Sequence, residues 1–407
     1  IWMQSNLNVA YLAPQLTALE ATFIYEEIAA VEKCGIRVIP FSVNRPKAYL
    51  KGNDSLLRRT RYLYDTNKFV IIFIGLLVFL ASGKSGLQAV RYLVHDIQKV
   101  GIFSKNAAKL AFQFFAGAML SKELKSNECD HLHIHFAHVA TQIGMYAATM
   151  ASIPYTVMAH ANDIFERGLL LKEKAERAKK FFTISDYNRQ YLVTKEVNNS
   201  NIAIIRCGVD ELEFNFKDFS PSEVIRLGTL GRLVEKKGVD DLLLATKTLK
   251  DRGLRVSLSI GGDGPLLGEL KSKVKALQIE NEVHFEGAIS RCALNDWMQK
   301  VDAFVLACKK DKNGDQDGIP VVLMEAMMRS VPVVSTSLSG IPELIIDKKT
   351  GLLAEPNSPL DLASKIETLI VDSNIKSIVE NAHKFTTKEF GRRVNTQRLI
   401  SFFKLCS

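Results

Sequence analysis

The sequence predicts an α/β protein with two domains, each built around a parallel sheet. The chain has 407 residues, which is more than one ordinary hydrophobic core requires. Short apolar segments of strand length alternate with segments of helix length, which is the pattern of repeated βαβ units. A polar, proline-containing stretch ends at Ser222, and the alternation then begins again. We therefore expect an N-terminal domain at 1–215 and a C-terminal domain at 216–386.

Composition and charge indicate which kinds of molecule the protein can bind. Hydrophobic residues make up 47% of the chain and charged residues 24%, as in ordinary globular proteins. Residues 1–210 hold 25 Lys and Arg against 17 Asp and Glu, a net charge of +8, and the rest carries +1 (28 minus 27). A basic half suits nucleic acid, an anionic membrane surface or an acidic substrate. No basic and aromatic recognition module occurs, which disfavours nucleic acid.

The cysteines and the first residues of the sequence indicate the cellular compartment of the protein. The six cysteines are scattered without a C-x-x-C pair, so we expect a reducing compartment and no zinc site. No signal sequence opens the chain. These two observations favour a cytoplasmic protein.

The N-terminal half begins with a βαβ unit. Asn8 to Leu12 reads as a strand, Phe23 to Cys34 as a helix that ends at Gly35, and Ile36 to Phe41 as the next strand. We expect the later strands of this half at 129–138, 155–159, 181–184 and 202–206. Loops at the carboxyl ends of such strands are where open α/β sheets bind ligands.

A basic stretch is followed directly by the longest apolar run. Arg45 to Lys68 holds seven basic residues against two acidic ones, and Phe69 to Ala81 is apolar throughout. Thirteen residues are fewer than the roughly 20 that a spanning helix needs. We favour a buried core element for this run, and a contact of Arg45–Ala81 with an anionic membrane surface is the second interpretation. A membrane span is the third.

Histidines gather near one strand end. The segment Cys129 to His138 alternates so that three histidines share one face, namely His131, His133 and His135. A metal site could form there, but no acidic ligand recurs nearby, so we expect none. His160 follows another strand at its carboxyl end, which makes it a candidate for a ligand cleft.

The C-terminal half contains a cationic loop between a strand and a helix. Val224 to Leu230 is an expected strand, and G-R-L-V-E-K-K-G follows it, with Arg232 and Lys237 ahead of a helix that runs to about Lys250. Two cations beside a helix N-terminus can hold a diphosphate. Further strands are expected at 254–260, 283–286, 303–307 and 331–335, and helices at 359–371 and 387–405.

The segment 314–343 contains one unusual carboxylate. Glu325 is the only charge between Gly318 and Met328, in a run too apolar to be a surface helix. Pro320 suits the start of that helix, and Asp317 with Gly318 precedes it. The pattern predicts an anion site at the helix tip and a ligand-binding carboxylate two turns further on. The alternative is a structural ion pair between Glu325 and a core Arg or Lys.

Several segments, in order, resemble the retaining glycosyltransferase family 4, which has the GT-B fold of two facing Rossmann-like domains. The resemblance is closest to the branch that builds exopolysaccharide, colanic acid and capsule repeat units. The segments that carry it are A-T-F-I-Y-E-E-I, H-I-H-F-A, A-H-A-N-D-I, R-C-G-V-D, G-R-L-V-E-K-K-G, G-G-D-G-P-L, D-G-I-P-V-V-L-M-E-A-M and P-V-V-S-T-S-L-S-G-I-P-E.

The resemblance implies roles for single residues. Catalytic roles would fall to His160 at the anomeric centre, Asp317 at the transferred sugar and Glu325 at the ribose. The donor diphosphate would contact Arg232, Lys237 and the backbone of Gly318 and Ile319, the acceptor side would include Thr22 and His135, and 387–407 would cross back onto the N-terminal domain. The sequence departs from the family at three places. The family usually has Glu at Asp317, the early S-E-T-F-I reads E-A-T-F-I at Glu20 and Ala21, and 328–330 (Met-Arg-Ser) replaces the usual small and glycine residues.

The implied activity is transfer of a sugar from a nucleotide-sugar, with UDP favoured, to a glycan or polyprenyl-diphosphate-linked glycan, with retention of configuration. Neither a metal nor another cofactor is expected. A nucleotide-sugar epimerase and a non-catalytic nucleotide-sugar-binding subunit of a polysaccharide synthase are the alternatives.

Overall fold

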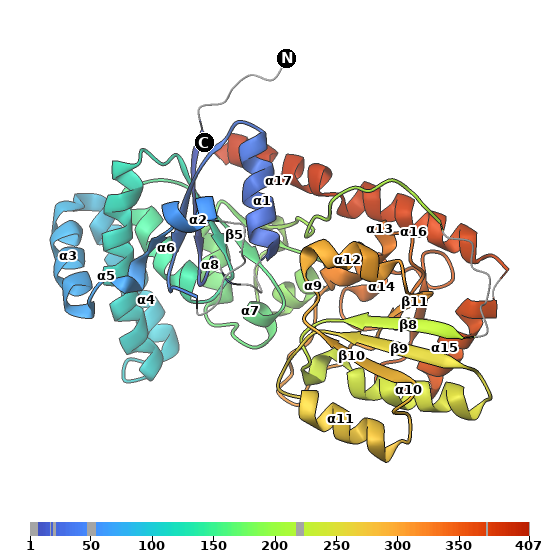
Figure 1. Cartoon of the computed structure of the whole chain (residues 1–407). Helices are drawn as coiled ribbons and strands as arrows, with labels where there is room; N and C mark the ends of the chain where they lie inside the picture. The colour runs from blue at the N-terminus through green and yellow to red at the C-terminus, as the bar shows by residue number, and fades with distance from the viewer. Residues whose placement is uncertain are drawn as a thin grey trace. The chain divides into compact units, whose positions relative to one another are not determined.

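A computed structural model describes residues 7–406, except 17, 19–21, 47–53, 217–223 and 372. The chain forms two compact units (Figure 1). Unit 1 comprises Ile1–Ile184, Asn188–Ile205 and Asn395–Ser407, and unit 2 comprises Ser185–Tyr187 and Arg206–Val394. The change between domains was predicted after residue 215.

Unit 1 is built on a parallel sheet of seven strands in the order β3-β2-β1-β4-β5-β6-β7. The strands β1, β4 and β5 are buried on both faces almost throughout, as expected where helices cover a parallel sheet on both sides. The strands are β1 (Asn8–Ala13), β2 (Arg37–Ser42), β3 (Arg61–Tyr62), β4 (His131–His135), β5 (Tyr155–Ala159), β6 (Lys180–Thr183) and β7 (Ile202–Ile204). The helices are α1 (Thr22–Lys33), α2 (Asp54–Arg59), α3 (Lys68–Ala81), α4 (Gly83–Val100), α5 (Lys105–Ser126), α6 (Val139–Ala151), α7 (Asn162–Phe165), α8 (Leu171–Arg177) and α9 (Asp186–Thr194), whose first two residues belong to unit 2.

The apolar run forms α3, and its interpretation as a core element was wrong. Only Ile71 and Gly75 of this helix are buried, and Gly75 lies so close to α5 that an added Cβ would come within 2.4 Å of the Phe115 carbonyl oxygen. Phe69 is 83% exposed and Leu80 is 67% exposed. Among the described residues, no helix is long and apolar enough to cross a membrane.

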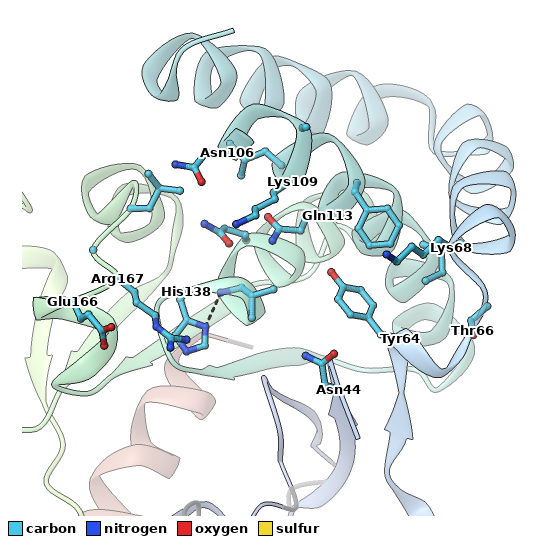
Figure 2. Close-up of a pocket in the computed structure, with 18 residues that line it drawn as sticks. Asn44, Tyr64, Thr66, Lys68, Asn106, Lys109, Gln113, His138, Glu166 and Arg167 are labelled. Carbon is cyan, nitrogen blue, oxygen red and sulfur yellow. Dashed lines mark hydrogen bonds between the residues drawn. The ribbon is translucent and has the colours of Figure 1, made fainter. Parts of the chain in front are cut away.

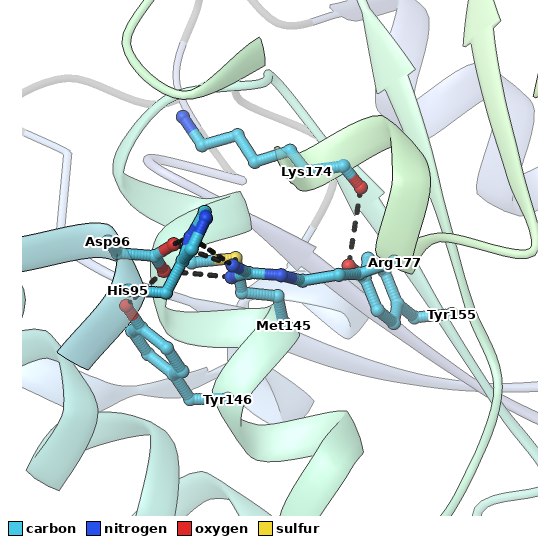
Figure 3. Close-up of polar contacts among 7 residues, drawn as sticks. All are labelled: His95, Asp96, Met145, Tyr146, Tyr155, Lys174 and Arg177. Carbon is cyan, nitrogen blue, oxygen red and sulfur yellow. Dashed lines mark hydrogen bonds and ion pairs between the residues drawn. The ribbon is translucent and has the colours of Figure 1, made fainter. Parts of the chain in front are cut away.

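A buried ion pair fixes the next helix, α4, to the body of unit 1 (Figure 3). Asp96 of α4 is fully buried and accepts two hydrogen bonds from Arg177 of α8, from Nη2 at 2.6 Å and from Nη1 at 2.8 Å. The hydroxyl of Tyr146, on α6, donates a third hydrogen bond to this carboxylate at 2.7 Å. Three helices therefore meet at one charge whose hydrogen bonds compensate for its loss of water.

Unit 2 has a parallel sheet of six strands in the order β10-β9-β8-β11-β12-β13. Two parallel-sheet domains confirm the predicted fold class. The strands are β8 (Ile225–Leu230), β9 (Val256–Gly261), β10 (Val283–Gly287), β11 (Ala303–Leu306), β12 (Val333–Thr336) and β13 (Leu352–Ala354). The helices are α10 (Val239–Asp251), α11 (Leu267–Ala276), α12 (Arg291–Met298), α13 (Val321–Met328), α14 (Ile341–Leu344), α15 (Pro359–Val371), α16 (Ile375–Phe390) and the first three residues of α17 (Arg392–Cys406).

The C-terminal segment is two helices, so the single helix expected at 387–405 was wrong. Gly391 separates α16 from α17, and the flanking residues bond to Val209: its N–H donates to the Phe390 carbonyl, and its carbonyl accepts from Arg392. From Asn395 onward α17 belongs to unit 1. There Phe403 packs on the rings of Tyr11 and His133, at the sheet.

Candidate active site

The cationic loop of unit 2 lies at the carboxyl end of β8. A short 3-10 turn, Glu235–Lys237, ends at Gly238, which has a φ of 62°. A Cβ at Gly238 would come within 1.7 Å of the Ala307 carbonyl oxygen, so only glycine allows the loop to approach the end of β11 this closely. This approach places the side chains of Lys236 and Lys237 beside the loop that follows β11.

Asp317 lies between these two lysines. Its carboxylate is 2.5 Å from Lys237 Nζ and 3.3 Å from Lys236 Nζ, and Lys236 also contacts Asp315 at 2.9 Å. Burial alone would raise the pKa of Asp317, but Lys237 and Lys236 hold it below its usual range. Asp317, expected to contact the sugar, thus pairs with Lys237, expected to contact the diphosphate. Lys236 is a third charged member of the site that the sequence analysis did not single out.

The tip of α13 follows Asp317 directly. Gly318 and Ile319 are both buried, and Pro320 caps the helix without a side-chain hydrogen bond. The first turn carries no acidic residue. Free N–H groups and the positive end of the helix dipole therefore remain available for an anion.

Glu325 projects from the same helix and is partly buried. No described residue forms an ion pair or side-chain hydrogen bond with its carboxylate, so the predicted alternative of a structural pair is wrong. Burial raises the pKa of Glu325, although Arg329 and Arg291 act in the opposite direction. A partly buried carboxylate without a partner among the described residues favours a hydrogen-bonding ligand.

Arg232 occupies the same loop and is exposed. The neighbouring N-terminus of α10 differs from the tip of α13, because Asp240 and Asp241 lie in its first turn. Lys309 contacts both carboxylates, at 2.7 and 3.1 Å. The α10 terminus is therefore already compensated, and the tip of α13 is the better anion site of the two.

His160 lies at the carboxyl end of β5 in unit 1, as the sequence predicted. Its backbone N–H donates to Asp163 at 2.8 Å, and Asp163 also accepts the N–H of Ala137, so this carboxylate fixes two loops. Burial lowers the pKa of His160 to about 3. The imidazole is therefore neutral at pH 7 and can act by hydrogen bonding.

The strand histidines contact a carboxylate that is distant in sequence. Glu27 of α1 lies 3.1 Å from His135 Nε2 and 3.5 Å from His133 Nε2, and it accepts a hydrogen bond from Tyr11 at 3.0 Å. His135 Nδ1 is in turn 3.4 Å from His160 Nε2. Burial would raise the pKa of Glu27, but the two histidines hold it well below its usual range.

This cluster is also a candidate metal site, because one ligand atom each from Glu27, His133 and His135 lie within 4.8 Å of one another. The argument that no acidic ligand lies near the histidines was therefore wrong. Hydrogen bonds join His135 to Glu27 and His133 Nδ1 to Thr156 at 2.8 Å, but His133 Nε2 is buried and has no hydrogen-bond partner among the described residues. That no metal is required stays a prediction.

The predicted acceptor residues lie in unit 1. Thr22 is the first residue of α1 and is half-buried, and His135 is fully buried. Glu20 and Ala21, where the sequence departs from the family pattern, lie outside the described residues. The structure places the remaining candidates, Arg232, Lys237, Asp317, Gly318, Ile319 and Glu325, together in unit 2.

The two parallel-sheet units define a protein of the GT-B class. The structure of Anabaena Alr3699/HepE in complex with UDP and glucose matches this fold with a TM-score of 0.71 and 17% identity, over 98% of this chain and 100% of that one. The model described as Glycosyltransferase Family 4 matches residues 23–211, and the model described as Glycosyl transferases group 1 matches residues 210–387. Together the two models span residues 23–387. The chain therefore belongs to the glycosyltransferases that these models describe and is an enzyme.

Two relatives are proteins of polysaccharide synthesis. The amylovoran biosynthesis glycosyltransferase AmsK of Erwinia amylovora is 29% identical over 98% of this chain and 99% of its own length. WcaL of Salmonella typhimurium, a protein assigned to colanic acid biosynthesis, is 31% identical over 206 residues. That match spans 50% of this chain and about half, 51%, of the relative.

Proposed function

We propose that the protein transfers a sugar, with retention of anomeric configuration, from a nucleotide-sugar to a glycan or lipid-linked glycan in exopolysaccharide synthesis. UDP-sugars are the favoured donors. The names of the relatives AmsK and WcaL support the polysaccharide pathway. The single observation that carries the donor assignment is the partnerless, partly buried carboxylate of Glu325 on the helix whose tip lies beside Lys236, Lys237 and Asp317.

The donor site would act mainly on the leaving group. Lys236, Lys237 and Arg232 with the α13 tip would stabilise the charge that develops on the diphosphate, worth a few kcal/mol per well-placed donor. A diphosphate that binds the lysines would compete with Asp317 for them. The freed Asp317 carboxylate would then be available to the transferred sugar.

The anomeric configuration is retained when the acceptor attacks the anomeric carbon on the same face from which the diphosphate leaves. The bond between the anomeric carbon and the phosphate oxygen breaks, the acceptor oxygen bonds to the same face, and the acceptor proton passes to the departing phosphate. His160, neutral because of its low pKa, would donate a hydrogen bond to the sugar without adding charge. Recovery of a glycosyl-enzyme ester would contradict this mechanism.

Membrane association is part of the proposal. The exposed apolar side chains of α3 support it better than the preceding basic stretch does, because Arg45, Arg59 and Arg61 pair with Asp65, Glu32 and Glu123. The five cysteines whose side chains the structure describes are free thiols, which fits a reducing compartment. We expect a peripheral protein at the inner face of the cytoplasmic membrane. Failure to sediment with anionic vesicles at low salt would refute this part.

A thermal-shift screen against UDP-, GDP-, ADP- and CMP-sugars tests the donor assignment, because a ligand of the native state raises the melting temperature. We expect stabilisation by one nucleotide class and its loss in Glu325→Ala and Arg232→Ala. Full transfer activity in either variant would overturn the site. Release of nucleotide with an altered sugar from donor alone would instead indicate an epimerase, and binding without turnover on any lipid-linked acceptor would indicate a non-catalytic subunit.

A further inference from the structure

Unit 1 contains a cavity of about 1230 Å³ at the carboxyl edge of its sheet (Figure 2). Asn44 follows β2, Tyr64 follows β3 and His138 follows β4, and all three line this cavity. The helices α3 and α5 form its other side. Its volume is on the order of that of ligand sites, and the carboxyl edge is where α/β sheets bind ligands.

The cavity has an excess of positive charge. Lys68 of α3, Lys109 of α5 and Arg167 after α7 line it, and among the described lining residues Glu166 is the only one with a carboxylate. None of the three cations forms an ion pair with a described carboxylate, whereas Arg45, Arg59 and Arg61 of the basic stretch do. All three side chains are exposed. Cations that line one cavity without ion-pair partners among the described residues favour a polyanionic ligand such as a diphosphate.

Apolar side chains are exposed next to these lining residues. Beginning beside Lys68, one stripe of α3 presents Phe69, Phe73, Leu76 and Leu80, which are 83%, 63%, 42% and 67% exposed. The stripe extends about 16 Å along the helix axis. Phe103, which immediately precedes the first turn of α5, is fully exposed. Soluble surfaces seldom leave such a stripe uncovered.

We propose that this cavity binds the diphosphate of a lipid-linked acceptor, through Lys68, Lys109 and Arg167, while the lipid chain lies against the exposed stripe of α3. The inference rests on the proposed function, since it names the acceptor of that reaction. A neutral free glycan has no charge for the three cations, and no free glycan, neutral or acidic, has hydrocarbon for the stripe. An amphiphile with a diphosphate head meets both, and the amides of Asn106, Gln113 and Gln142 in the lining can bind its first sugar.

Calorimetric titration of the full chain with farnesyl diphosphate, inorganic pyrophosphate and farnesol tests the assignment. We expect farnesyl diphosphate to bind more tightly than either of the others. Lys109→Ala and Arg167→Ala should each weaken its binding about tenfold, as expected for loss of a charge-assisted hydrogen bond. The matched control is Lys84→Ala, an exposed lysine of α4 outside the cavity, which should leave binding unchanged.

The apolar contribution is tested with the double variant Phe73→Ser and Leu80→Ser. It should weaken farnesyl diphosphate binding and leave pyrophosphate binding unchanged. Both side chains are exposed, so the melting temperature should not fall. Three results would overturn the inference. The first is equal affinity for farnesyl diphosphate and pyrophosphate. The others are a loss of farnesyl diphosphate binding in Lys84→Ala equal to that in Lys109→Ala, and a loss in Lys237→Met where Lys109→Ala shows none.

Donor binding separates this inference from the proposed function. If no nucleotide-sugar stabilises the unaltered protein, the proposed function fails. If a nucleotide-sugar stabilises the cavity variants as it does the unaltered protein, but farnesyl diphosphate binding does not depend on Lys109 or Arg167, the acceptor site alone fails.

Discussion

Replacement of Glu325 by Gln should separate ligand binding from stability. The carboxylate is partly buried and has no described partner, so burial raises its pKa and its charge costs folding free energy. Glutamine keeps the shape and removes that charge. We therefore expect the free energy of unfolding to stay the same or to rise by up to about 1 kcal/mol at pH 7.

Donor binding should change in the opposite direction. A hydrogen bond to an ionised acceptor contributes about 1.5–3 kcal/mol, more than its neutral counterpart. Loss of one such bond to a ribose hydroxyl corresponds to roughly 10- to 100-fold weaker binding. Transfer measured at low donor concentration should fall in proportion.

Urea unfolding and calorimetric titration with the nucleotide-sugar that the screen selects measure the two effects. The control is Glu269→Gln, an exposed carboxylate of α11 in the same unit. If Glu325→Gln lowers stability by more than 1 kcal/mol while donor affinity is unchanged, Glu325 is a structural partner and the reasoning fails.

Three further predictions concern stability and metal. Asp96→Ala should cost about 3–5 kcal/mol in urea unfolding, because it leaves Arg177 buried without its partner, and a loss below 1 kcal/mol would contradict the buried pair. Burial holds the pKa values of His131 and His160 at about 3, so between about pH 4 and 6.5 the unfolded chain binds more protons and stability falls on acidification. His131→Asn should reduce this slope by up to about 1.4 kcal/mol per pH unit, and an unchanged slope would argue against it. Treatment with EDTA should leave transfer unchanged, and a loss restored by added zinc would assign the cluster at Glu27 to a metal.

The sequence predicted the elements whose pattern is local. The strand β5 and the helix α15 have the bounds that apolar periodicity indicated, because β5 is buried throughout and α15 buries one periodic face. The strand β3 was missed, since two residues show no period. Gly391 ends α16 through hydrogen bonds of the flanking backbone to Val209, a partner that a local pattern does not contain.

The candidate site was predictable where charge stood out from its surroundings. Glu325 was found because it is a lone charge in an apolar run. Lys236 was not, since spacing alone does not distinguish it from Lys237. Glu27 lies on a helix more than 100 residues from His135, and one acidic residue on a mixed helix gives no signal. The contact between Glu27 and His135 is seen only in the fold, where β1 lies parallel to β4 and both side chains come to one edge of the sheet.

The helix α3 shows why an apolar run predicts burial but not what buries it. Hydropathy measures transfer from water and does not distinguish a protein interior from lipid. The packing face is marked by Gly75, which lets the helix approach the backbone at Phe115. Only a narrow side of the helix packs, so the remaining apolar side chains need a second partner outside the described chain. Because Lys68, at the start of the same helix, lines a cationic cavity, that partner should carry charge at one end and hydrocarbon at the other.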